Sequence, residues 1–176
     1  MKRQRLNVKV CFIGHRHIKK DESTISLLRQ TIVDLINKGT TAFLFGSMSE
    51  FNKLSWEIVT ALKEEYPHIK RVYVRAIYKY IDKSYEEFLL KSYEETYYPP
   101  KLEKAGKYSY VERNFEMIDN SAFCIFYYNE NYVPILNTRQ KHNMPLPSKR
   151  NSGTKIAYDY AKKKNKEIIN IYRQSS

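Results

Sequence analysis

Two short turns in this sequence combine glycine with hydroxyl side chains directly before a segment of helical periodicity. Ser152-Gly153-Thr154 opens the run "SGTKIAYDYAKKKN", and Gly46-Ser47 follows the apolar run "TTAFLF". Free backbone N–H groups at a helix start, together with the helix dipole, favour an anion such as phosphate. Ser and Thr also cap helices that bind nothing, so a plain N-cap is the alternative. We expect the anion site, with Lys149 and Arg150 adding positive charge before the turn.

Titratable side chains stand near two other turns. His15 and His17 form a His-x-His pair, but no Cys and no paired carboxylates stand nearby, so the pattern is weak evidence for a metal. We therefore expect no metal, and the sequence indicates no cofactor. Glu50 is the carboxylate nearest to the Gly46-Ser47 turn. It is either an acid–base group or an ordinary first-turn helix residue that the helix dipole favours.

The elements that must position these residues alternate along the chain. Apolar runs bounded by Gly or polar residues predict strands at 7–14, 40–46, 69–78, 122–129 and 166–172. Amphipathic spacing predicts helices at 21–39, 49–67, 110–121 and 152–165. The Tyr-rich segment 79–108 is expected to be a partly helical excursion. The loop at 130–151 is long and contains three prolines, as functional loops often do.

This alternation predicts an α/β protein whose mainly parallel sheet of about five strands is covered on both faces. We expect one domain over residues 1–176. In open α/β sheets, ligands bind outside the carboxyl ends of the strands. The turns at Gly14-His15-Arg16, Gly46-Ser47 and Ser152-Gly153-Thr154 would all lie at such ends, although the first also fits a plain surface turn.

The net charge of +12 comes from the two ends of the chain. Residues 1–20 carry seven basic and no acidic side chains, whereas residues 21–129 are close to neutral. Such basic regions suit nucleic acid or a phosphorylated ligand, and they also occur as solvated lysine-rich surfaces. No apolar run is long enough to span a bilayer and no signal peptide is recognisable. Cys11 and Cys124 fit buried thiols, so we expect a cytoplasmic protein without disulfides and without a membrane partner.

Four fragments in order resemble the SLOG superfamily, which groups the Lonely Guy phosphoribohydrolases with the DNA-processing Smf proteins and small YpsA-like proteins. The fragments are "CFIGHR", "FGSMSEFNKLSWEIVTALKEEYP", "YYPPKLEKAGKYSYVERNFEMIDNSAFCIFYY" and "SGTKIAYDYAKKKNKEIINI". They cover nearly the whole chain, and the closest look-alikes are short bacterial and phage members. The resemblance implies a Rossmann-like three-layer sandwich, usually dimeric, that binds a nucleotide or a nucleotide-derived ligand.

The resemblance also assigns residues. Arg113 with Met117 matches the R-x-x-x-M helix start of the Lonely Guy enzymes, which implies that Arg113 contacts the ligand phosphate or ribose. Position 157, three after Thr154, is Ala where these hydrolases keep Glu, and the preceding Pro-Gly-Gly is absent. Relatives often have Phe-Asp where this chain has Phe51-Asn52. Both departures favour binding over N-glycosidic cleavage.

Three functions remain open. In the first, the protein is a sensor or sequestering module, linked by resemblance to bacterial or phage immune signalling, that binds a nucleotide-derived small molecule. Its predicted ligand-binding residues are Gly14, His15, Arg16, Gly46, Ser47, Arg113, Asn114, Ser152, Gly153 and Thr154. In the second, it cleaves the N-glycosidic bond of a nucleoside monophosphate or a related compound, with Glu50 or another acid as the catalytic group. In the third, it binds single-stranded DNA through basic segments and exposed tyrosines, and rings such as Tyr78 or Tyr127 stack on bases.

Overall fold

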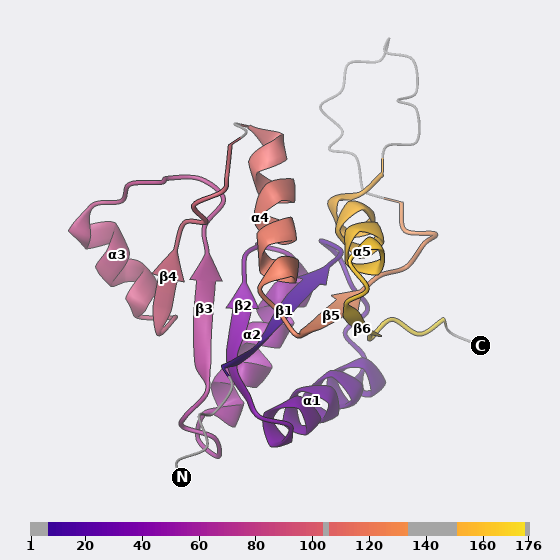
Figure 1. The fold of residues 1–176 in the computed structure, drawn as a ribbon. Coiled ribbons are helices and arrows are strands. Elements are labelled where there is room, and N and C mark those ends of the chain that lie inside the picture. Colours follow the sequence, from indigo (N-terminus) through magenta and orange to yellow (C-terminus); the bar gives the residue numbers. More distant parts are fainter. Residues whose placement is uncertain (1–6, 104–105, 134–150, 175–176) are drawn as a thin grey trace, which may run out of the picture.

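The computed structural model describes residues 7–103, 106–133 and 151–174, which form strands and helices in regular alternation (Figure 1). The strands are β1 (Val8–Gly14), β2 (Thr40–Phe45), β3 (Lys70–Val74), β4 (Glu95–Tyr97), β5 (Phe123–Tyr127) and β6 (Glu167–Asn170). The helices are α1 (Glu22–Asn37), α2 (Glu50–Leu62), α3 (Lys83–Leu90), α4 (Lys107–Asp119) and α5 (Gly153–Lys163).

The six strands form one sheet in the order β4-β3-β2-β1-β5-β6, and every neighbouring pair is parallel. From β1 the chain builds outward through β2, β3 and β4 on one side, and then returns to add β5 and β6 on the other. Strand order therefore reverses between β1 and β5. Such a switch point opens a crevice at the carboxyl edge of an α/β sheet.

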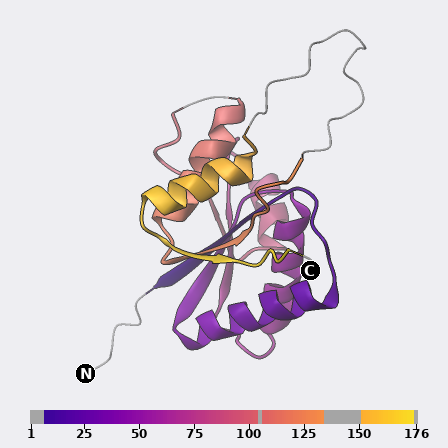
Figure 2. The same ribbon diagram turned by 90° about the vertical axis from the view of Figure 1, so that its right-hand side faces the viewer.

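Helices cover the two faces of the sheet in pairs. Figure 2 shows α4 and α5 above the sheet and α1 and α2 below it. The lower core contains Phe12, Phe43 and Phe45 from the strands with Phe51 of α2, and the upper core contains Cys11 and Cys124 with Met117 of α4. Alternate strand residues enter opposite cores because side chains alternate across a sheet. The prediction of a Rossmann-like three-layer α/β fold is confirmed.

The predicted strand number was too low. The sheet has six strands in the described residues rather than about five, because Glu95–Tyr97 pairs with β3. This segment has only three residues, two of them polar, so it carries no apolar run that periodicity detects. β3 is also shorter than the predicted 69–78, because the chain turns away after Arg75 and reaches a positive φ of 61° at Tyr78.

Both cysteines are buried and reduced, as their apolar surroundings predicted. Cys11 and Cys124 occupy paired positions on β1 and β5. Burial raises the pKa of the Cys11 thiol well above its usual value, so this thiol is an inert core group. Among the helices of the described residues, none combines the length and apolar content needed to cross a membrane.

Candidate functional site

The first turn at the switch point is built around a buried histidine. His15 follows β1 and is 2% exposed, and its Nε2 lies 3.0 Å from the backbone nitrogen and 3.1 Å from the backbone oxygen of Asn129. Its ring stacks on Tyr132 at 3.9 Å between centroids. Burial lowers the pKa of His15 to about 4, so the imidazole is neutral at pH 7. Nδ1 is a buried atom without a hydrogen-bond partner in the described residues.

Glycine at positions 14 and 46 leaves space for two large side chains. A Cβ on Gly14 would lie 2.4 Å from a ring carbon of Phe51, so the end of β1 packs directly on α2. A Cβ on Gly46 would lie 2.7 Å from Cδ and Nε of Arg113. The first glycine therefore serves packing, whereas the second makes room for the guanidinium of a predicted ligand-binding residue.

The start of α2 is a dense network of short polar side chains. Ser49 caps the helix and accepts from the backbone N–H of Asn52 at 3.1 Å, while Ser47 and Ser49 hydroxyls lie 3.0 Å apart. Asn52 is 3% exposed: its Oδ1 accepts from Gly46 N–H at 3.3 Å and its Nδ2 donates to Phe12 carbonyl at 3.2 Å. The amide at position 52 thus joins β1, β2 and α2. Sequence reasoning saw there only the loss of an acid and missed this bridging role.

Glu50 holds the loop that follows β1. Its Oε2 accepts the backbone N–H of Ile18 at 3.0 Å, and its Oε1 lies 3.7 Å from Nδ1 of His17. The backbone N–H of Glu50 donates to the carbonyl of Arg16 at 2.9 Å. The Ile18 hydrogen bond is the main cause that lowers the pKa of the Glu50 carboxyl. A general acid needs a raised pKa, so this environment suits an ionised, loop-fixing carboxylate better. The side chain of Arg16 is exposed.

Arg113 is the most unusual charged residue of this edge. It is 2% exposed on α4, and its Nη1 donates to the carbonyl oxygens of Gly46 and Val74, at the carboxyl ends of β2 and β3. Its Nε donates to Oδ1 of Asn114 at 3.0 Å, and the ring of Tyr110 lies 5.7 Å from the guanidinium. Burial lowers the pKa of Arg113 to about 10, which leaves the group charged at pH 7. No carboxylate of the described residues forms an ion pair with it.

The turn before α5 is a capped helix start. Ser152 Oγ accepts the backbone N–H of Lys155 at 3.1 Å, Thr154 is 7% exposed, and Gly153 has open space around its Cα. Within the described part of the chain, no hydrogen bond joins these three residues to His15 or Arg113. Lys149 and Arg150 lie outside the described residues. The Ala at position 157 is 1% exposed in the upper core, so a carboxylate there would be buried.

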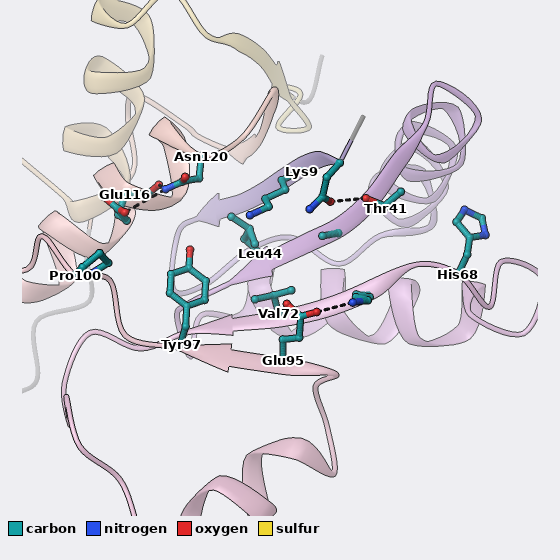
Figure 3. Close-up of a pocket in the computed structure, with 13 residues that line it drawn as sticks. Lys9, Thr41, Leu44, His68, Val72, Glu95, Tyr97, Pro100, Glu116 and Asn120 are labelled. Atoms are coloured by element: carbon teal, nitrogen blue, oxygen red, sulfur yellow. Dashed lines mark hydrogen bonds and ion pairs between the residues drawn. The ribbon is translucent and has the colours of Figure 1, made fainter. Parts of the chain in front are cut away.

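Two grooves lie beside the sheet, and Arg113 lines neither of them. One of about 700 Å³ lies at the ends of β5 and β6, between residues such as Asn129, Tyr158 and Asn170. The other, of about 610 Å³, lies on the face of β2 to β4 beside α4, with Lys9, Tyr97 and Glu116 in its walls (Figure 3). Figure 3 shows that this second groove runs along the strands, from Thr41 and His68 at their amino ends to Tyr97 and Pro100 at and beyond the end of β4. It contains none of the predicted site residues.

The candidate residues therefore fall into groups. Direct contacts bring Gly46, Arg113 and Asn114 together. Ser47 follows Gly46 in the turn between β2 and α2. Gly14 and His15 stand at the switch point, next to Asn129 and Tyr132, which sequence reasoning did not single out. Asn129 was expected to end the strand at 122–129 and Tyr132 to lie in the loop at 130–151, so their only signal was a position at the carboxyl end of a strand. The described residues hold no cluster of three or more His, Cys, Asp or Glu side chains suited to a metal ion.

Comparisons with known proteins add one solved structure. No family model and no curated protein matches this sequence. The fold is similar to that of DNA processing protein A from Helicobacter pylori, solved in a study of its single-stranded DNA binding mode, with a TM-score of 0.53 and 17% identity. The match covers 92% of this chain and 64% of that chain. At this identity the likeness establishes the Rossmann-like fold, which fits the SLOG resemblance at the level of fold, while membership of that superfamily stays a prediction.

Proposed function

We propose that this protein binds single-stranded DNA along the carboxyl edge of its sheet, with Arg113 holding a backbone phosphate. The observation that carries the proposal is the buried guanidinium of Arg113, which no described carboxylate neutralises. A buried charge without a partner is costly, and a phosphate that arrives with the ligand offsets this cost. The donors left on a guanidinium match phosphate oxygens well.

An aromatic ring beside Arg113 favours a nucleic acid over a simple anion. Tyr110 lies over the guanidinium and is 46% exposed. Exposed rings next to a phosphate site are the surface that unpaired bases stack on. The net charge of +12 and the single-stranded DNA binding of the protein with a similar fold support the same function.

A nucleotide-derived small molecule is the second candidate. The tight fit around Arg113 favours a small ligand. Two carbonyl oxygens already accept from Nη1, and the Arg113 side chain fills the space that a Cβ at position 46 would need. Such a site holds one phosphate rather than several. Both candidates use Arg113, so they differ in whether the bound molecule extends beyond it.

The test measures the binding of a labelled thymidine 12-mer by fluorescence anisotropy at 50 mM salt. Nucleoside monophosphates are then added as competitors. Arg113→Lys keeps a charge but loses the planar donor fork, and we expect affinity for the 12-mer to fall about tenfold. Arg29→Lys is the matched control, because Arg29 of α1 pairs with Glu65, three residues after α2, and Figure 2 shows α1 and α2 on the opposite face of the sheet from α4.

Each outcome decides between the two candidates. Saturable 12-mer binding that Arg113→Lys weakens and Arg29→Lys leaves unchanged supports the proposal. A wild-type protein that binds no oligonucleotide at this salt overturns it. Full competition by a monophosphate at equal concentration indicates the small-molecule ligand instead.

A further inference from the structure

A group of aromatic rings lies exposed where β3 leads into α3. Tyr78 and Phe88 are each 62% exposed, and Tyr85 between them is 36% exposed. Tyr85 and Phe88 are nearly parallel, with centroids 6.2 Å apart and an interplanar angle of 15°, and Tyr78 meets the edge of Tyr85 at 6.2 Å. We call these three rings the α3 platform. Exposed rings in contact with one another are unusual in a surface helix, which normally faces water with polar groups.

The backbone is fixed so that the platform is presented to solvent. Tyr78 has a φ of 61°, a left-handed conformation that costs about 1 kcal/mol for a residue of this size. Arg75 Nη1 donates to the Tyr78 carbonyl at 2.9 Å and holds this turn. Asp82 then caps α3 by accepting the backbone N–H of Tyr85 at 2.8 Å. A strained residue that the surroundings hold in place points to a function for its side chain.

The platform begins where the Arg113 site ends. Arg113 contacts the carbonyl of Val74, and the next residue, Arg75, is the one that holds Tyr78. Tyr73 lies between the two regions, because both of them act on its hydroxyl. Burial raises the pKa of this hydroxyl, while the charge of Arg113 lowers it and the hydroxyl of Tyr85 raises it. Nε of Arg75 is also a buried donor without a partner in the described residues. A chain that leaves Arg113 along β3 therefore reaches the three rings.

Charge around the platform suits a polyanion. Helical spacing puts Tyr85 and Phe88 on one side of α3 and Glu86 and Glu87 on the other. Lys79 and Lys91 are exposed just before and just after α3, whereas Lys83 pairs with Glu87 at 3.8 Å on the side away from the rings. An apolar protein partner would need no such lysines, whereas a nucleic acid backbone does.

We propose that Tyr78, Tyr85 and Phe88 stack on successive unpaired bases of a strand whose phosphate Arg113 holds. This inference rests on the proposed single-stranded DNA binding and gives the strand a direction across the molecule, from α4 over β3 to α3. It also predicts that a nucleoside monophosphate bound at Arg113 does not contact all three rings.

The experiment compares Phe88→Ala with Leu90→Ala. Leu90 is 45% exposed on the same helix but on another side, so both variants remove an exposed apolar side chain at similar cost to folding. Affinities are measured for a thymidine 12-mer, thymidine monophosphate and a 12-mer of abasic sugar phosphates. Base stacking on one ring predicts that Phe88→Ala binds the thymidine 12-mer about 5- to 100-fold more weakly, with no change for the monophosphate or the abasic 12-mer.

The outcomes separate this inference from the function on which it rests. If wild-type protein binds the 12-mer and Phe88→Ala behaves like Leu90→Ala, the platform is rejected and single-stranded DNA binding stands. If no oligonucleotide binds, both fail. If Phe88→Ala leaves DNA affinity unchanged but converts a dimer to a monomer in sedimentation, the rings are a contact between copies of the chain and the inference is overturned.

Discussion

At the scale of single residues, His15 makes stability depend on pH. The folded protein holds its pKa at about 4, whereas an unfolded chain has the usual value near 6.5. The unfolded state therefore binds the proton first as pH falls. The contribution is complete above about pH 6.5 and is lost progressively toward pH 4, by up to about 3 kcal/mol.

Chemical unfolding at pH 7.5 and pH 4.5 measures this loss. His15→Gln removes the titrating group, so its free energy of unfolding should change less between the two pH values than that of the wild type. His68→Gln, at an exposed position, should keep the wild-type difference. Equal pH dependence in all three proteins would contradict a buried, neutral His15.

Gly46 makes the space that the Arg113 side chain occupies. A Cβ there meets Cδ, Nε and Cζ of Arg113, which must shift away from its buried hydrogen bonds. Gly46→Ala should therefore lower the free energy of unfolding by about 1–3 kcal/mol and weaken oligonucleotide binding about tenfold. Gly153→Ala is the matched control: the added methyl group has open space, and helix propensity predicts equal or slightly higher stability with unchanged binding. Retained binding in Gly46→Ala would argue against Arg113 as the phosphate contact.

At the scale of elements, the end of β1 packs so closely on α2 that no room remains for a side chain at Gly14. Gly14→Ala forces its methyl group into the fully buried ring of Phe51, and overpacking of this kind costs about 1–3 kcal/mol. In a double-mutant cycle, Phe51→Leu should recover part of that loss, because it removes the ring atoms that clash. The readout is the midpoint of thermal unfolding, and a cycle with no coupling would show that β1 and α2 do not pack as closely as described.

Ala157 tests whether α5 can accept the carboxylate that the Lonely Guy hydrolases, which the sequence resembles, carry at this position. Position 157 is in the upper core with Met117 and Ile118, so Ala157→Glu buries a charge without a partner. We expect a loss of about 3 kcal/mol or more in unfolding free energy and no release of free base from nucleoside monophosphates. A stable variant that releases base would instead place this position at the ligand site.

Most of these elements could be predicted because their apolar residues repeat with helix or strand periodicity over at least five residues. β4 could not, since three residues at a sheet edge carry too little pattern. Arg113 was found by resemblance, but its burial depends on Gly46 and Val74, which lie 67 and 39 residues away. The burial of His15 depends likewise on Asn129, 114 residues later. Contacts at such separations follow from strand order, which local sequence does not encode.

At the scale of the whole molecule, salt dependence separates phosphate contacts from base contacts. Each phosphate neutralised on a single strand contributes about 0.7 to the slope of log affinity against log salt concentration. Arg113→Gln removes one such contact, so its slope for the 12-mer should be shallower by about that amount. Phe88→Ala removes an uncharged ring, so it should lower affinity at every salt concentration and leave the slope unchanged. Titrations at 50, 100 and 200 mM salt measure both. A strand held through a single phosphate would give a slope near 0.7, and equal slopes for all three proteins would mean that the positive charge of this chain acts away from Arg113.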